Sequence, residues 1–201
     1  MKGFRIGVMA LALLCASPVL AADILGTSLV DGRKVEILSD GTWRFSEPLP
    51  EDCTSLTSQL LLCATDGKWI KVAPATADIT AQFRHNDTTY ALVIVEDIGA
   101  KQGLTNELMR EIVLDNAAAA IGFDREDVSV VSVDDTQLFG KPAETLSYFM
   151  EIDGLPVLYR NTVLIDADQT VQALTYEVAT ELTAAHTTLH AEYLEELRWR
   201  E

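Results

Sequence analysis

The sequence predicts an α+β fold in which an antiparallel sheet is flanked by helices and preceded by a small β-meander. Three strand-like runs, at 143–152, 155–165 and 170–178, are joined by turns that are too short for a parallel crossover of a dozen residues. Two segments with helical spacing of apolar residues, 105–121 and 181–198, lie before and after these strands. Helices packed on one antiparallel sheet are the simplest arrangement of this order.

The first 22 residues have the pattern of a secretory signal peptide. Lys2 and Arg5 give a positive start, residues 6–14 are apolar, and Ala21 and Ala22 offer a cleavage site. The apolar run is shorter than the roughly 20 residues that a membrane span requires. We therefore expect a periplasmic or secreted protein, with no membrane insertion after the signal peptide is removed.

The charge of the chain limits its partners. Its 201 residues include 31 acidic and 15 basic side chains, which gives a formal net charge of −16. Nucleic acids are poor partners for such a chain, because binding their phosphates requires clustered Lys and Arg. A hydrophobic fraction of 48% indicates a globular rather than a disordered protein. The charge instead favours a basic partner.

Residues 23–47 predict a small β-meander. Asp40-Gly41 is a strong hairpin-turn dipeptide, and Trp43 and Phe45 lie on one face of the strand that follows it. A unit of two or three short strands is not stable alone. We therefore expect its aromatic face to dock, either on the rest of the chain or on a partner.

A proline-rich acidic linker at 48–52 separates the meander from an α+β domain at 53–201. The first helix of this domain is expected at 105–121, with Thr105 as its N-cap and Gly122 as its stop. Further strands are expected at 69–72, 79–83, 89–95 and 128–133.

Two cysteines, Cys53 and Cys63, remain after the signal peptide is removed. In an oxidising compartment an even pair is most simply a disulfide. A redox or metal pair is the alternative, but a spacing of ten matches neither C-x-x-C nor a usual zinc site.

His186 and His190 are four residues apart on the expected terminal helix, so both imidazoles lie on nearly one face. Such a pair can bind zinc or copper, which makes a periplasmic metal-binding protein the alternative function. No third ligand is evident from the sequence, so neither a metal site nor a cofactor is assigned. A half-buried histidine beside the apolar stripe is the simpler interpretation.

Catalytic motifs are scarce in this sequence. It contains no G-x-S-x-G elbow, no Walker loop and no G-x-G-x-x-G fingerprint. A hydrolase that uses His85 with acidic pairs such as Glu96-Asp97 and Asp134-Asp135 is a weaker alternative. The sequence therefore favours a non-enzymatic protein, with no catalytic residue assigned.

The order of elements over 53–201 resembles the PsbP-like α/β/α sandwich family, which includes small bacterial periplasmic proteins. The resemblance includes the Gly140-Lys141-Pro142-Ala143 start of the long strands and the amphipathic terminal helix. It implies an accessory, assembly or binding role, with another exported or envelope protein as the partner.

Residues 32–43 resemble a G-x-x-V-x-L-x-x-D-G-T-W element of uncharacterised secreted bacterial proteins. This sequence departs from the pattern by having Ile37-Leu38 where one aliphatic residue is usual. The element implies no activity.

Overall fold

The computed structural model describes residues 23–30, 33–46, 49–50, 52–64, 67–122 and 124–200. The expected signal peptide at 1–22 lies outside the described residues. Within them the strands form three separate sheets, of three, seven and three strands. No helix in the described ranges has the length and apolar character needed to cross a membrane.

The seven-stranded sheet is antiparallel throughout, as the short turns predicted. Its strands, in spatial order, are β6 (Ile70–Val72), β7 (Ala81–Arg84), β8 (Thr89–Glu96), β12 (Thr170–Val178), β11 (Leu155–Ile165), β10 (Lys141–Ile152) and β9 (Ser129–Leu138). β9 is longer than the sequence suggested, and β10 begins two residues earlier than expected.

Two-residue turns connect the long strands on either side of β10. Asp153-Gly154 joins β10 to β11 with φ of 53° and 78°, which confirms the predicted hairpin. Phe139-Gly140 joins β9 to β10 with φ of 55° and 73°. Positive φ at both central residues is the geometry of a type I′ turn, which matches the twist of the flanking strands.

The first long helix, α1 (Asn106–Ile121), begins and ends as predicted. The Thr105 hydroxyl accepts a hydrogen bond from the Leu108 N–H at 3.2 Å, and Gly122 ends the helix with φ of 71°. Short 3₁₀ helices precede and follow it, η1 (Ala100–Gln102) and η2 (Arg125–Asp127).

The second helix, α2 (Ala184–Glu196), is shorter than the predicted 181–198. The prediction was wrong at the C-terminal end, where Leu197–Trp199 form strand β13. This strand pairs antiparallel with β5 (Leu60–Cys63), which in turn pairs with β4 (Cys53–Ser55). The predicted Cys53–Cys63 disulfide is present and links β4 to β5.

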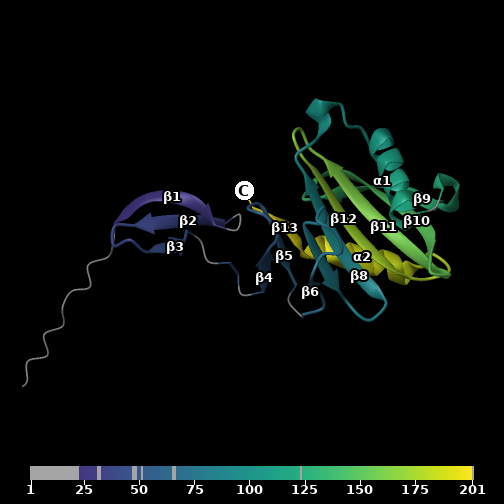
Figure 1. The fold of residues 1–201 in the computed structure, drawn as a ribbon, viewed down its shortest axis with the longest axis horizontal. Coiled ribbons are helices and arrows are strands. Elements are labelled where there is room, and N and C mark those ends of the chain that lie inside the picture. Colours follow the sequence, from purple (N-terminus) through teal and green to yellow (C-terminus); the bar gives the residue numbers. More distant parts are fainter. Residues whose placement is uncertain are drawn as a thin grey trace, which may run out of the picture.

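The large sheet lies between the two helices, each of which covers one face (Figure 1). Successive side chains of a strand point to opposite faces of the sheet, so each strand contributes residues to both layers. On β10 and β11, Leu146 and Val163 pack in a core with α1, whereas Ala143 and Leu164 pack in a core with α2. The chain therefore has the α+β class that the sequence predicts, with the sheet as the middle layer.

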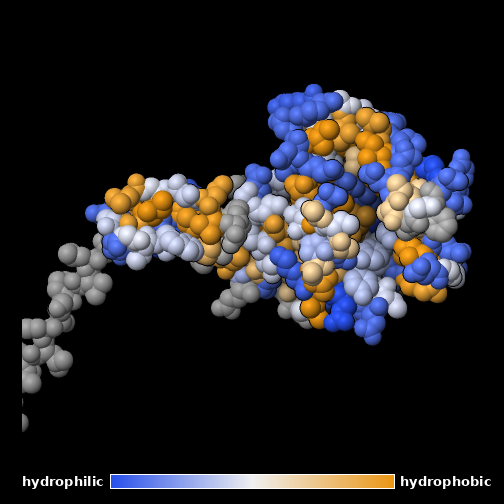
Figure 2. Space-filling model, viewed as in Figure 1, coloured by the Kyte–Doolittle hydropathy of each residue, from blue (hydrophilic) through white to orange (hydrophobic). Residues whose placement is uncertain are grey.

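The meander forms its own sheet from β1 (Ile24–Val30), β2 (Arg33–Leu38) and β3 (Trp43–Phe45). Trp43 and Phe45 share a face and make an edge-on ring contact at 5.4 Å. Trp43 is 53% exposed and Leu25 is 70% exposed, so this sheet keeps apolar side chains on its surface. Figure 2 shows orange, hydrophobic groups along the meander.

Candidate functional site

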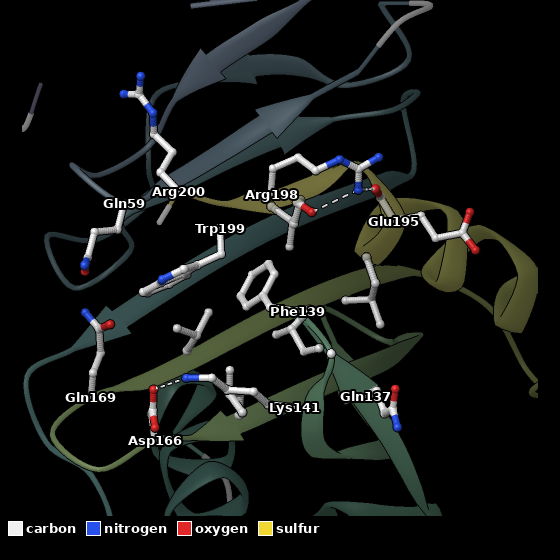
Figure 3. A pocket seen from close by; sticks show the side chains of 16 residues that line it. Gln59, Gln137, Phe139, Lys141, Asp166, Gln169, Glu195, Arg198, Trp199 and Arg200 are labelled. Carbon is white, nitrogen blue, oxygen red and sulfur yellow. Dashed lines mark hydrogen bonds and ion pairs between the residues drawn. The ribbon is translucent and has the colours of Figure 1, made fainter. Parts of the chain in front are cut away.

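A cleft of about 760 Å³ lies beside β13. The β9–β10 turn and the β11–β12 turn form the side opposite β13 (Figure 3). Four buried side chains form its apolar floor: Leu138, Leu164, Val171 and Leu197. The cleft therefore brings together three segments that are far apart in the sequence.

Phe139 and Trp199 form the aromatic part of this cleft. Their ring centroids are 5.3 Å apart with the planes tilted by 43°, and both side chains are half-buried. In Figure 3 the two rings point toward one another across the middle of the cleft. Aromatic side chains that are held over an apolar floor are typical anchors for protein recognition.

The backbone at Phe139 is strained. Its φ of 55° lies in the left-handed region, which costs an L-residue with a bulky side chain roughly 1–2 kcal/mol. Type I′ turns prefer Asn or Asp at this position, as the Asp153-Gly154 turn illustrates. Strain of this kind clusters at functional sites, where the side chain that it positions is used. The turn thus points to a role for the Phe139 ring.

Two of the charged groups around the cleft form an ion pair. Lys141 pairs with Asp166, and this contact lowers the pKa of the Asp166 carboxyl. The Arg198 guanidinium donates a hydrogen bond to the Glu195 carbonyl oxygen. Three glutamines complete the rim: Gln59, Gln137 and Gln169. The cleft therefore offers a ligand an apolar, aromatic and amide surface, with Arg198, Arg200 and Glu195 also in its lining.

β13 adds backbone to this surface. It is an edge strand of the small sheet and pairs with β5 alone among the described strands. All three of its residues line the cleft. An edge strand can receive an extended peptide through its outer backbone groups. In β13 the Leu197 N–H already donates to the Leu194 carbonyl oxygen, and the Leu197 carbonyl oxygen accepts from the Arg198 guanidinium, so Trp199 is the residue that can extend the sheet.

The structure separates the two histidines of the expected metal pair. His190 is buried, with Nε2 2.8 Å from the Thr162 hydroxyl and Nδ1 2.9 Å from the Thr175 hydroxyl. His186 Nδ1 instead accepts a hydrogen bond from the Thr183 N–H at 3.0 Å. Each imidazole is thus engaged within the protein, and the pair does not face a shared metal position.

The groups considered for hydrolysis lie in different places. The His85 ring is 5.0 Å from the Trp69 ring, and its Nδ1 is 3.3 Å from the Lys68 carbonyl oxygen. Glu96 accepts a hydrogen bond from Gln172 on the neighbouring strand. Among the residues that the structure describes, no three His, Cys, Asp or Glu side chains are grouped closely enough to hold a metal ion.

No protein-family model and no curated protein sequence matches this chain. Solved structures do resemble it. Cyanobacterial PsbP (CyanoP) from Synechocystis is 12% identical with a TM-score of 0.47, over 93% of this chain and 98% of that protein. The PsbP-like sandwich expected from the order of elements is therefore among the similar structures.

Two further solved structures resemble the chain at lower coverage or similarity. A Bacteroides thetaiotaomicron protein is 8% identical with a TM-score of 0.45, over 71% of this chain. This chain spans 45% of the length of that protein. LpqN, involved in cell envelope biogenesis of Mycobacterium tuberculosis, is 14% identical with a TM-score of 0.30, over 77% of this chain and 82% of LpqN. The α+β class rests on the sheets and helices of the chain itself.

Proposed function

We propose that this protein is a non-enzymatic accessory protein that binds an extended segment of another exported or envelope protein. One observation carries the proposal. A strained turn holds Phe139 opposite Trp199, over an apolar floor and beside the edge strand β13. This arrangement has the parts of a peptide-binding groove: a strand edge for the backbone and an aromatic pocket for a side chain.

The segment would add to β13 as a further antiparallel or parallel strand. Its backbone would hydrogen-bond to the edge of β13 at Trp199, and one apolar side chain would pack against the two rings. The glutamine rim would supply hydrogen bonds around that anchor. A basic partner fits best, because the net charge of −16 raises its association rate.

The lining of the cleft favours binding over catalysis. A general acid or base has to reach a reacting group with its proton-transferring atom available. In this cleft the Asp166 carboxylate is held by Lys141, and a lowered pKa makes it a weak base. His85, His186 and His190 are absent from the described lining. We therefore assign the cleft no catalytic role.

The Cys53–Cys63 disulfide supports the proposed location. Structural disulfides form and persist in oxidising compartments, such as the periplasm or the extracellular space. An exported protein is consistent with this bond, and a partner in the same compartment follows from the proposal.

Site-specific photo-crosslinking tests the function. A photoreactive residue replaces Gln169 at the rim of the cleft, and crosslinked products are compared in cells that export the protein. We expect one dominant partner, captured by the parent protein and lost with Trp199→Ala or Phe139→Asn. Asn suits the left-handed turn position, so Phe139→Asn removes the ring while keeping the hairpin. The matched control is Trp43→Ala, which removes an exposed tryptophan of the meander.

The outcome is decided by the pattern across the variants. A partner lost with both cleft variants and kept with Trp43→Ala supports the proposal. An identical set of products with all proteins, or a partner that depends on Trp43 alone, refutes it. Low and high salt separate steering by charge from the apolar anchor, because salt weakens only the former.

A further inference from the structure

A second cavity, of about 480 Å³, lies between α2 and the sheet face that α2 covers. Its chemistry differs from that of the cleft, because hydroxyl and charged side chains dominate its lining. Arg160 on β11, Asp134 and Asp135 on β9, and Thr187 on α2 contribute to it. A volume of this size suits a small molecule.

Arg160 is the unusual group of this cavity. Its side chain is 7% exposed, and the buried Nε has no hydrogen-bond partner. No ion pair of Arg160 occurs among the residues that the structure describes. A guanidinium has five N–H donors and stays charged in proteins, so burying it without a contacting anion is costly. Burial lowers the pKa of Arg160, and the charge of Asp134, which lies beyond ion-pair distance, offsets only part of that effect. The side chain is therefore placed for an anionic group that enters the cavity.

The register of the sheet gives Arg160 polar neighbours. Ser147 on β10 and Thr175 on β12 lie directly opposite it, and Ser132 on β9 lies opposite Ser147. The Ser147 hydroxyl is buried and also lacks a hydrogen-bond partner. The hydroxyl residues Ser132 and Thr145 line the cavity together with Arg160, and an arginine beside hydroxyl groups matches the planar, two-oxygen geometry of a carboxylate.

Two carboxylates on β9 make the cavity unsuitable for a multiply charged anion. Asp134 lies two strands away from Arg160 and two residues further along the strand direction. Standard strand spacings put the two Cα atoms about 12 Å apart. Asp135 lines the same cavity. One cation and two carboxylates repel phosphate or sulfate, but they attract a molecule that carries a carboxylate at one end and an ammonium at the other.

His190 adds no positive charge to this arrangement. Burial and the nearby Arg160 lower the pKa of His190 to about 3, so the imidazole is neutral at ordinary pH. Hydrogen bonds to Thr162 and Thr175 fix the ring against the sheet. Arg160 is therefore the single cation in the described lining.

We propose that this cavity binds a small zwitterionic amino-carboxylate of the α-amino-acid type, with its carboxylate on Arg160 and its ammonium beside Asp134 and Asp135. The site lies apart from the Phe139–Trp199 cleft, so it does not depend on the proposed protein-binding function. Bound ligand neutralises the buried guanidinium and fills the space between α2 and the sheet.

Isothermal titration calorimetry of the protein with each standard α-amino acid tests this site, with acetate, methylammonium and inorganic phosphate as partial probes. We expect at least one amino acid to bind more tightly than all three partial probes. Arg160→Met should weaken that amino acid by at least about 30-fold, the usual loss when one member of a buried charged contact is removed. Asp134→Asn should weaken it about two- to fivefold, since this carboxylate is exposed. Asp97→Asn, an exposed acidic residue outside the cavity, should leave it unchanged.

The Arg160→Met variant has a second expected result. Removing a buried charge that lacks a partner should raise the thermal midpoint of the ligand-free protein while binding is lost. If this variant does not fold, the comparison of Asp134→Asn with Asp97→Asn decides the question. The proposal is overturned if no standard amino acid binds, if phosphate binds more tightly than all of them, or if both Asp variants bind like the parent protein.

Discussion

Mild acid should destabilise this protein, because His190 resists protonation in the folded state. The ring is 2% exposed and lies between the Thr162 and Thr175 hydroxyls. Burial, together with the charge of Arg160, lowers the pKa of His190 from 6.5 to about 3. In the unfolded chain the same imidazole titrates near its ordinary value.

Proton linkage gives the sign and size of the change in the free energy of unfolding with pH. Below about pH 6.5 the unfolded chain binds a proton that the folded protein does not, so the free energy of unfolding falls as the pH falls. The loss amounts to roughly 1.4 kcal/mol between about pH 7.5 and about pH 5.5, and it approaches about 1.4 kcal/mol per further pH unit. It stops growing only near pH 3, the folded-state pKa.

Two carboxyl groups with shifted pKa values also contribute to the pH dependence of stability. Asp166 has a lowered pKa because of its contact with Lys141, so its stabilising effect is lost only at lower pH. Glu144 has a pKa raised by burial, which acts with the opposite sign near its ordinary titration range. Both groups are present in the parent protein and in the variant compared below, so their contributions cancel in the difference between the two pH profiles.

Urea unfolding followed by circular dichroism at several pH values measures this effect. The parent protein and His190→Gln are compared, because Gln offers the hydroxyls an amide in place of the imidazole and does not titrate. We expect the variant to be less stable at neutral pH and to have a flatter pH dependence between about 7.5 and 5.5. Parallel curves for the two proteins would show that His190 is not the group responsible and would refute the reasoning.

Three other substitutions have defined expected outcomes. Gly99→Ala should destabilise the protein by several kcal/mol in urea unfolding, since a Cβ at this position would lie 2.3 Å from the Asp166 carbonyl oxygen. An unchanged unfolding midpoint would contradict this close approach of the two backbones. Replacing Cys53 and Cys63 together by Ser should cost about 2.5–3 kcal/mol through loop entropy, and the same loss should follow from reducing the parent protein. Tyr193→Phe should leave stability unchanged or raise it by up to about 1 kcal/mol, because the buried hydroxyl has no hydrogen-bond partner among the described residues; a large thermal destabilisation would reveal one.

The large sheet could be predicted because its signals are local. Asp153-Gly154 has the composition of a two-residue turn, and the strands on each side of it follow at once. Thr105 and Gly122 mark the ends of α1 by capping chemistry that depends on a few neighbouring residues.

The small sheet could not be predicted because its pairing is tertiary. Leu197 continues the four-residue spacing of Leu189 and Tyr193, so the sequence favours one more helical turn. The structure places Leu197 opposite Leu62 instead. Residues 197–199 form a strand because both side chains are buried on the α2 face of the sheet. A local sequence pattern carries no information about this tertiary contact.

The Phe139–Trp199 cleft and the Arg160 cavity could not be predicted from the sequence, for related reasons. Phe139 occupies a turn position that Asn or Asp usually fills, so the Phe-Gly dipeptide gave no turn signal. Arg160 is a charged residue in a strand, where exposure is the normal expectation. Its burial follows from α2 covering that face, which depends on the whole fold.

The pairing of β13 with β5 also determines when folding can finish. Leu62 and Leu197 are partners although 135 positions separate them along the chain, so this ladder closes a very long loop. During synthesis β5 is made long before β13, so its apolar side chains stay without their β13 partner until the end of the chain is available. The disulfide needs only a local encounter and can hold β4 and β5 together in the meantime. Formation of the Cys53–Cys63 disulfide would thus prepare the edge of β5 on which β13 later pairs. The pairing of β13 would then complete both the core and the cleft.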